Sequence, residues 1–298
     1  MINKIIRALV DHGPLTGNEL LRAIGDVDKF ELWRACFRYN TLQISSFARY
    51  YLRYDLKIDD YLRLSPSIIR DFLTYTLIAL PHQRGELHRR QLILCNQHRD
   101  ISVAKLRIVT ELFAEINDRV TPQTKAATCA FVAGDIAYFM GHSEDRPSPA
   151  TGEMMRGSDI DIVIVHTDDA RADDIALIDR HLYARKPILM KHPDYRQELD
   201  YIIKPLDRVS AQAAYESIQD KIACKIIYES VFMWGSPRVY VDVRAAIERQ
   251  AIHDRIQADF ASAIEDRARA VDEILSSPTV SPETKALFYA SQERVEFT

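Results

Sequence analysis

The chain has 298 residues, with 39 Lys and Arg against 43 Asp and Glu, and a formal net charge of −4. Hydrophobic residues make up 47% and charged residues 28%, a composition that excludes a chain disordered throughout its length. The slight negative charge excludes a protein coated with basic residues for non-specific nucleic-acid binding, although it leaves room for a local basic patch. The four dispersed cysteines have no CxxC spacing, which excludes a zinc ribbon and a redox pair.

The first ten residues do not resemble a signal peptide, because Lys4 and Arg7 interrupt the apolar residues and no small-residue cleavage site follows. No stretch comes near the roughly 18 uninterrupted apolar residues that a membrane span needs. We therefore expect a cytoplasmic protein that does not engage a membrane.

Residues 1–64 resemble a winged helix-turn-helix module. Apolar spacing predicts three short helices, the second opened by a Thr16–Glu19 capping box and the third starting near Asp28, and then an extended stretch. In such a module the third helix contacts DNA or another nucleic acid. The alternative is a small packing or homodimerisation domain, which the periodicity allows equally. The exposed basic residues that would touch nucleic acid are Arg34, Arg38, Arg49 and Arg53.

Residues 65–120 are predicted to form a helical connector. Ser65 and Pro66 predict the start of one helix, and apolar residues recurring every seven positions predict a second from Glu86 to Asp118. Basic residues outnumber acidic ones on the second helix, which indicates either a solvated face or a track for a phosphate backbone. These basic residues are Arg84, Arg89, Arg90, Arg99, Lys105 and Arg107.

Residues 121–242 show a different periodicity, which predicts an α/β layer. Three short apolar runs predict strands, at 128–133, 159–165 and 198–203, and the segments between and after them have helical spacing. Residues 243–298 are predicted to be a C-terminal helical segment that ends in a short helix from Pro282 to about Glu293.

The strongest chemical signal is the run Gly157-Ser158-Asp159-Ile160-Asp161. Two aspartates at i and i+2 on a strand point to the same face, where two carboxylates need a compensating positive charge. Mg²⁺ or Mn²⁺ with oxygen ligands meets that need. Asp200 is an acid within another apolar strand, where an unpaired charge is costly, and it would complete a two-metal site. The alternative is an ordinary surface turn.

These residues are similar to the metal-binding strand of the nucleotidyltransferase superfamily that includes DNA polymerase beta. The resemblance covers residues from about 125 to 240 and implies an α/β (α+β) core with a small mixed sheet. In that family a strand ends in a glycine turn that opens a helix and holds phosphate. Gly134 follows the strand 128–133 and is the favoured turn, with Gly141 as the alternative. The chain departs from the family in having Asp135 after the turn glycine and a longer interval before Asp159.

The resemblance implies transfer of a nucleoside monophosphate from an NTP by two-metal in-line attack. Asp159, Asp161 and Asp200 would hold Mg²⁺ or Mn²⁺, and Asp200 would also serve as general base. Weaker candidates for phosphate contact or catalysis are Arg146, Arg156 and His142. The residues expected to bind the nucleotide are Gly134, Asp135, Gly157, Ser158, Lys221 and Lys225.

The acceptor hydroxyl stays open at this point. The winged-helix-like start favours RNA or tRNA, and another nucleotide is a close alternative. A protein acceptor, as in AMP-transferring toxin–antitoxin enzymes, and anti-phage signalling are further alternatives. A function of a different class is a non-catalytic, nucleotide-sensing regulator that binds DNA.

Overall fold

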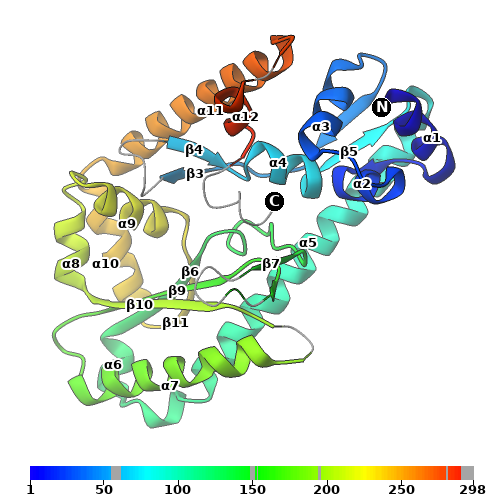
Figure 1. Cartoon of the computed structure of the whole chain (residues 1–298). Coiled ribbons are helices and arrows are strands. Elements are labelled where there is room, and N and C mark those ends of the chain that lie inside the picture. The colour runs from blue at the N-terminus through cyan, green and yellow to red at the C-terminus, as the bar shows by residue number, and fades with distance from the viewer. Residues whose placement is uncertain (55–61, 148–151, 153, 194–195, 280, 290–298) are drawn as a thin grey trace. The chain divides into compact units, whose positions relative to one another are not determined.

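The computed structural model describes residues 1–54, 62–147, 152, 154–193, 196–279 and 281–289. It is a mixed α+β protein with long helices and small sheets, which confirms the general fold class (Figure 1). The chain forms two compact units. The terminal unit comprises Met1–Arg53, Leu62–Gln97 and Asp259–Thr298, and the central unit comprises Tyr54–Tyr61 and His98–Ala258.

This division differs from the four consecutive segments expected from the sequence, 1–64, 65–120, 121–242 and 243–298. Residues from the C-terminal helical segment join the N-terminal residues in one unit, and the predicted connector is shared between the units. Two of the boundaries, Gln97/His98 and Ala258/Asp259, fall within α5 (Arg84–Ala114) and α11 (Ile252–Ser276), and the others lie at Arg53/Tyr54 and Tyr61/Leu62. A boundary within a continuous helix leaves no break in the periodicity of the sequence.

The terminal unit begins with the three predicted helices. Thr16 Oγ1 accepts the Glu19 N–H at 3.2 Å and Glu19 Oε2 accepts the Thr16 N–H at 2.9 Å, which confirms the capping box. Asp28 caps the third helix by accepting the Glu31 N–H at 3.0 Å. The helices are α1 (Ile2–His12), α2 (Gly17–Ile24) and α3 (Lys29–Arg38).

The terminal sheet is antiparallel, with the order β1 (Leu15–Thr16), β5 (Thr76–Ala79) and β2 (Gln43–Ser46). Two further strands, β3 (Tyr51–Tyr54) and β4 (Leu62–Ser65), pair with each other. The end of the predicted extended stretch, residues 55 and 56, lies outside the described residues.

The helix predicted from Ser65 and Pro66 is shorter than the apolar spacing indicated. Ser67 is its cap, and α4 (Ile68–Arg70) continues into the single π-helical turn η1 (Asp71–Tyr75). The backbone then becomes extended as β5, because its apolar residues are needed to join β1 and β2.

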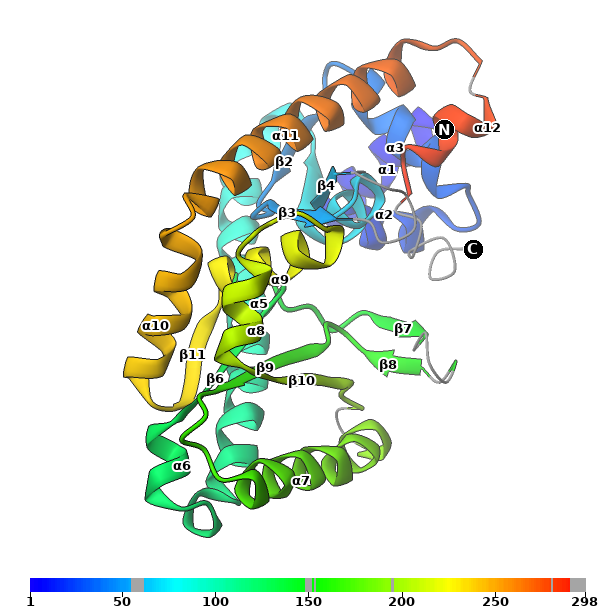
Figure 2. The same ribbon diagram turned by 90° about the vertical axis from the view of Figure 1, so that its left-hand side faces the viewer.

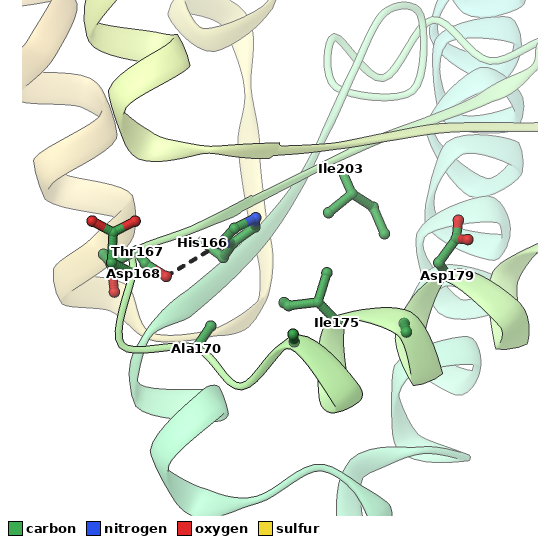
Figure 3. A pocket seen from close by; sticks show the side chains of 9 residues that line it. His166, Thr167, Asp168, Ala170, Ile175, Asp179 and Ile203 are labelled. Atoms are coloured by element: carbon green, nitrogen blue, oxygen red, sulfur yellow. Dashed lines mark hydrogen bonds between the residues drawn. The ribbon is translucent and has the colours of Figure 1, made fainter.

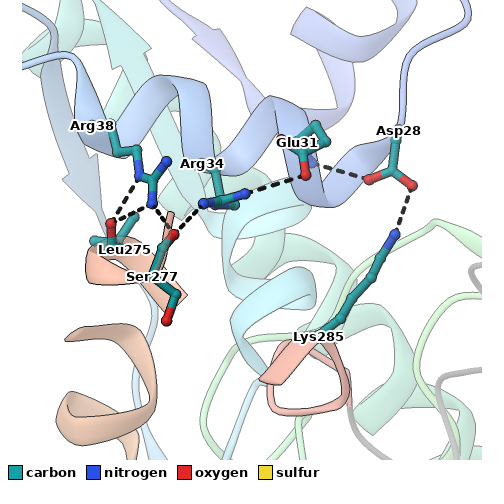
Figure 4. Close-up of polar contacts among 7 residues, drawn as sticks. All are labelled: Asp28, Glu31, Arg34, Arg38, Leu275, Ser277 and Lys285. Carbon is teal, nitrogen blue, oxygen red and sulfur yellow. Dashed lines mark hydrogen bonds and ion pairs between the residues drawn. The ribbon is translucent and has the colours of Figure 1, made fainter. Parts of the chain in front are cut away.

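The structure contradicts the expected exposure of Arg34 and agrees with that of Arg38, and both side chains bind the end of α11 (Figure 4). Arg34 is buried and donates to the Ser277 carbonyl at 2.8 Å. Arg38 donates to the carbonyls of Leu275 and Ser277 at 2.6 and 2.7 Å. Both arginines therefore bind the carbonyls at the C-terminal end of α11, which a helix leaves without internal partners.

The last segment of the chain completes the terminal core. Phe288 lies edge-on to Phe30 with ring centroids 5.2 Å apart, and it also contacts Trp33. Arg267 of α11 pairs with the buried Asp71 at 2.9 Å. The last short helix, α12, spans Pro282–Ala286, and residues 290–293 of the predicted helix lie outside the described residues.

The central unit contains a four-stranded sheet with the order β10-β9-β6-β11. β9 runs parallel to β10 and antiparallel to β6, and β11 was not predicted. α7 covers one face, and α8, α9 and α10 cover the other (Figure 2). The strands are β6 (Thr128–Ala133), β9 (Ile160–His166), β10 (Leu199–Pro205) and β11 (Val231–Gly235), and the helices are α7 (Ala172–Lys191), α8 (Leu206–Gln212), α9 (Ile218–Glu229) and α10 (Pro237–Glu248).

The helix predicted over 209–230 is two helices, α8 and α9, because Ser217 interrupts it with a new capping box formed with Asp220. A hairpin precedes β9 within the long predicted connection. In the described part of the chain no helix is long and apolar enough to cross a membrane. The remaining elements are η2 (Pro81–Gln83), η3 (Asn117–Arg119), α6 (Pro122–Ala126), β7 (Asp145–Pro147) and β8 (Met154–Arg156).

Candidate functional site

The predicted acidic residues lie at the end of the central sheet where β9 and β10 begin. Asp161 is paired in register with Asp200 on the parallel neighbouring strand, so both side chains leave the same face. Asp159 lies two residues before Asp161. The intervening Ile160 and Ile162 belong to the apolar cluster shared with α7. The Asp161 side chain therefore leaves the face covered by α8, α9 and α10, whereas the Asp200 carboxylate, on the edge strand, contacts Lys186 of α7.

The turn after β6 lies directly against this carboxylate face. Ala133 pairs with Asp161, and Gly134 follows with a φ of +74°, a conformation that favours glycine. A Cβ atom at Gly134 would lie 3.2 Å from Asp161 Oδ2. Three i+3 backbone hydrogen bonds follow, the first from the Ala137 N–H to the Gly134 carbonyl, and one i+5 bond from the Met140 N–H to the Asp135 carbonyl. The resemblance led us to expect that this turn opens a helix. Residues 135–139 form a series of turns instead.

The buried carboxylate of Glu229 on α9 holds this turn in place. Its Oε1 accepts the Gly134 N–H at 3.1 Å and the Lys225 ammonium at 2.7 Å. The Glu229 side chain is only 1% exposed. Burial and the nearby Glu229 carboxylate also raise the pKa of Tyr138. The predicted nucleotide ligand Lys225 is thus next to the turn, with its charge paired inside the protein.

The turn before β9 is fixed by Ser158. Its hydroxyl donates to Asp135 Oδ2 at 3.0 Å and accepts the His142 N–H at 3.2 Å. The neighbouring Gly157 has a φ of +74°, and a Cβ atom there would lie 1.8 Å from the His142 carbonyl oxygen. Ser158 therefore orders the backbone that presents Asp159.

The alternative turn glycine, Gly141, has a different environment. Its N–H donates to Ser102 Oγ at 2.9 Å, and its carbonyl lies 2.8 Å from His98 Nδ1. Burial lowers the pKa of His98, which keeps the ring neutral at pH 7 and leaves Nδ1 able to donate as one tautomer. Gly141 thus packs against α5, whereas Gly134 directly follows a sheet strand and borders Asp161.

Asp200 is more exposed than its apolar neighbours suggested. Its side chain is 55% exposed, because β10 is the edge strand of the sheet. The ammonium of Lys186 on α7 lies 2.8 Å from Asp200 Oδ1. The expected partner charge is therefore present, and it is supplied by a lysine.

The predicted carboxylates fit Mg²⁺ or Mn²⁺ in the chemistry of their donor atoms. Asp159, Asp161 and Asp200 offer hard oxygen donors near one strand end, and Lys186 already places a cation at one of them. Among the residues with described positions, no three His, Cys, Asp or Glu side chains are grouped closely enough to hold a metal ion. Binding would need the Asp200 side chain to move from Lys186 toward Asp159 and Asp161.

The remaining candidates are spread around this end of the sheet. Lys221 is partly buried on α9, one turn before Lys225. Arg156 is exposed on β8, and His142 is buried with Nε2 4.0 Å from Asp135 Oδ2. The Arg146 side chain and residues 148–151 and 153 of the long connection lie outside the described residues.

A separate shallow pocket of about 540 Å³ lies at the other end of β9 (Figure 3). Ile203 of β10 and Ile175 of α7 face each other across it, and His166, Asp168 and Asp179 lie around its edge. None of the predicted site residues lines this pocket. The carboxylate end of the sheet and this pocket are therefore distinct candidate sites.

Sequence reasoning missed three residues that shape the carboxylate end: Lys105, Lys186 and Glu229. Lys105 was assigned to a solvated or phosphate-binding face, but it is only 4% exposed. Its position between apolar residues on one face of α5 was the available signal. Glu229 follows Lys225 at i+4, a spacing that itself predicts an ion pair.

Comparison with protein-family models, with curated proteins and with solved structures gave no match. The resemblance to nucleotidyltransferases therefore depends on the Asp159–Asp161 motif, and any assignment of function depends on the residues described above.

Proposed function

We propose that the chain is a metal-dependent nucleotidyltransferase that transfers a nucleoside monophosphate from an NTP to an acceptor hydroxyl. The observation that carries the proposal is the register of Asp161 with Asp200 on parallel strands. Asp159 lies directly before β9, the strand that carries Asp161, and the Gly134 turn borders the Asp161 carboxylate. Acidic side chains converging on a glycine turn suit a triphosphate with its cations.

Asp159, Asp161 and Asp200 would hold Mg²⁺ or Mn²⁺. When bound, the metal ions neutralise the triphosphate and make the acceptor hydroxyl more acidic. The acceptor oxygen would form a bond to the α-phosphorus while the bond to the bridging oxygen breaks and pyrophosphate leaves. Asp200 would take the proton of the acceptor hydroxyl after its carboxylate leaves Lys186.

The turns around the carboxylates would position the phosphates. Gly134, Asp135, Gly157 and Ser158 form the two turns that meet at this end of the sheet. Lys221 is the more suitable lysine for the triphosphate, because Lys225 is already paired with Glu229. In this proposal Lys225 does not contact phosphate. It binds Glu229, which holds the Gly134 turn in place.

The acceptor class stays a choice between RNA or tRNA, a second nucleotide and a protein. The burial of Arg34 and Lys105 removes part of the basic surface that had favoured a nucleic acid. Arg38 donates to carbonyls of α11, which also weakens the case for a regulator that reads DNA through α3. Two alternative roles stay open for the terminal unit, homodimerisation and contact with DNA.

The test is a transfer assay with each NTP labelled at the α-phosphate, Mg²⁺ or Mn²⁺, and total RNA, a second NTP or the protein alone as acceptor. We expect label to move into one of these acceptors. Asp159→Asn and Asp161→Asn should abolish transfer, whereas the matched control Asp168→Asn, at the other end of β9, should retain it. Loss of transfer only in Asp168→Asn would move the site to the pocket in Figure 3.

A further inference from the structure

The ammonium of Lys105 on α5 lies inside the central unit, at the beginnings of both acid-bearing strands. It donates to the Ser158 carbonyl at 2.6 Å and also binds Gln197 Oε1. Ser158 directly precedes Asp159, and Gln197 lies three residues before Asp200. One side chain therefore ties together the two backbone segments that present the predicted metal ligands.

The regular ladder between the strands does not fix these segments by itself. Register pairing of β9 with β10 begins at Ile160 and Leu199, and the Ile160 N–H donates to the Glu198 carbonyl at 2.9 Å. Ser158 and Gln197 lie before that pairing, and the Arg156 N–H donates to the Arg196 carbonyl at 3.1 Å on their other side. Lys105 thus adds a side-chain connection between these two backbone contacts, at the turns from which the carboxylates leave.

The buried position of the Lys105 ammonium is unfavourable for the stability of the fold. Lys105 is 4% exposed, and burial of a charge costs free energy that an apolar side chain of similar length avoids. The ammonium is nevertheless held by the Ser158 carbonyl and the Gln197 side chain, which belong to two different backbone segments. The contacts of Lys105 therefore fix the position of one segment relative to the other.

We propose that Lys105 is a positioning residue that sets the separation of Asp159 and Asp161 from Asp200, and thereby the affinity of the site for a divalent cation. This inference rests on the proposed function. Lys105 touches neither substrate nor cation in it. The ammonium acts through the Ser158 carbonyl and the Gln197 side chain.

The charge of Lys105 and its position have opposite effects on cation binding. As a nearby positive charge it repels a divalent cation, so its removal on electrostatic grounds alone would tighten binding. As a positioning residue it supports the ligands, and its removal would weaken binding. The sign of the change in affinity therefore separates the two roles.

The experiment is a titration of the full chain with Mn²⁺ alone, with free Mn²⁺ measured by electron paramagnetic resonance. Lys105→Met and Gln197→Met should each raise the Kd by about 10-fold to 100-fold, the usual cost of removing a group that supports a metal ligand. Both variants lose the contact between Lys105 and Gln197, so their effects should not add. The Mn²⁺ Kd of the double variant should therefore exceed that of the weaker-binding single variant by no more than about 2-fold.

Lys204→Met is the matched control. Lys204 is also a buried ammonium on a glutamine side chain, with Nζ 2.8 Å from Gln212 Oε1, and it lies on the same sheet four residues after Asp200. The Lys204→Met variant should leave the Mn²⁺ Kd within about 2-fold of the original. If Lys105→Met does not fold, Gln197→Met tests the same contact from its neutral partner.

Unchanged or tighter Mn²⁺ binding by a folded Lys105→Met or Gln197→Met variant would overturn the positioning role and leave the proposed function standing. Absence of Mn²⁺ binding by the unsubstituted chain, or equal binding by Asp159→Asn and Asp161→Asn, would instead refute the metal site itself. The two failures are therefore distinguishable in one series of titrations.

Discussion

Gly134 carries two constraints that act at the scale of a single residue. Its φ of +74° strains any other residue, and an added Cβ atom would lie 3.2 Å from Asp161 Oδ2. Gly25 has a similar φ of +84° with no atom within 4 Å of an added Cβ, so it carries only the first constraint. Comparing substitutions at Gly134 and Gly25 therefore separates the effect of backbone strain from the effect of a steric contact with the Asp161 carboxylate.

Gly134→Ala and Gly25→Ala should each lower the free energy of unfolding by about 1 to 3 kcal/mol, the cost of placing a side chain on a backbone with a positive φ. Only Gly134→Ala should also weaken Mn²⁺ binding, because it pushes against Asp161. Urea unfolding and the Mn²⁺ titration measure the two effects. Equal Mn²⁺ affinity in both variants would show that the Gly134 turn does not support the site.

At the scale of an element, α11 is held within the terminal unit by two kinds of contact. One is to the carbonyls at its C-terminal end, and the other is to a side chain that it carries. Arg34 and Arg38 bind carbonyls at its C-terminus, and Arg267 on the helix pairs with Asp71. Positive charge at a helix C-terminus is favourable because the unpaired carbonyls there carry partial negative charge. The basic residues of α3 thus stabilise another helix.

Arg34→Met should lower the free energy of unfolding by about 1.5 to 3 kcal/mol, the range for a hydrogen bond to a charged group. The control is Arg22→Met, an exposed position on α2 that should change it by less than about 0.5 kcal/mol. Gel shifts with DNA at two salt concentrations should be the same for both variants. Unchanged stability with loss of a DNA complex in Arg34→Met would restore α3 as a DNA-reading helix.

At the scale of the whole molecule, the sequence predicts elements whose signals are local. Thr16 with Glu19 and Asp28 mark helix starts through neighbouring atoms, and β9 follows from its alternating and then fully apolar residues. β11 was missed because its run from Val231 to Gly235 is short and lies between two helices. A short apolar run does not distinguish a strand from a helical turn.

The site could be predicted only as far as it lies on single strands. Alternation predicts that Asp159 and Asp161 share a face, and the register places Asp200 beside Asp161. The roles of Lys105 and Lys186 depend on which helix packs beside which strand end. Such distant contacts leave no periodicity in the sequence, so a buried lysine and an exposed one look alike.

Pyrophosphate release is the measurement that tests the central claim most directly. The chain is incubated with an NTP labelled at the γ-phosphate, Mg²⁺ or Mn²⁺, and the acceptor identified by transfer. Our account predicts label in pyrophosphate from the unsubstituted chain, and no release above background from Asp161→Asn. Label in inorganic phosphate, or pyrophosphate release that survives Asp161→Asn, would contradict it.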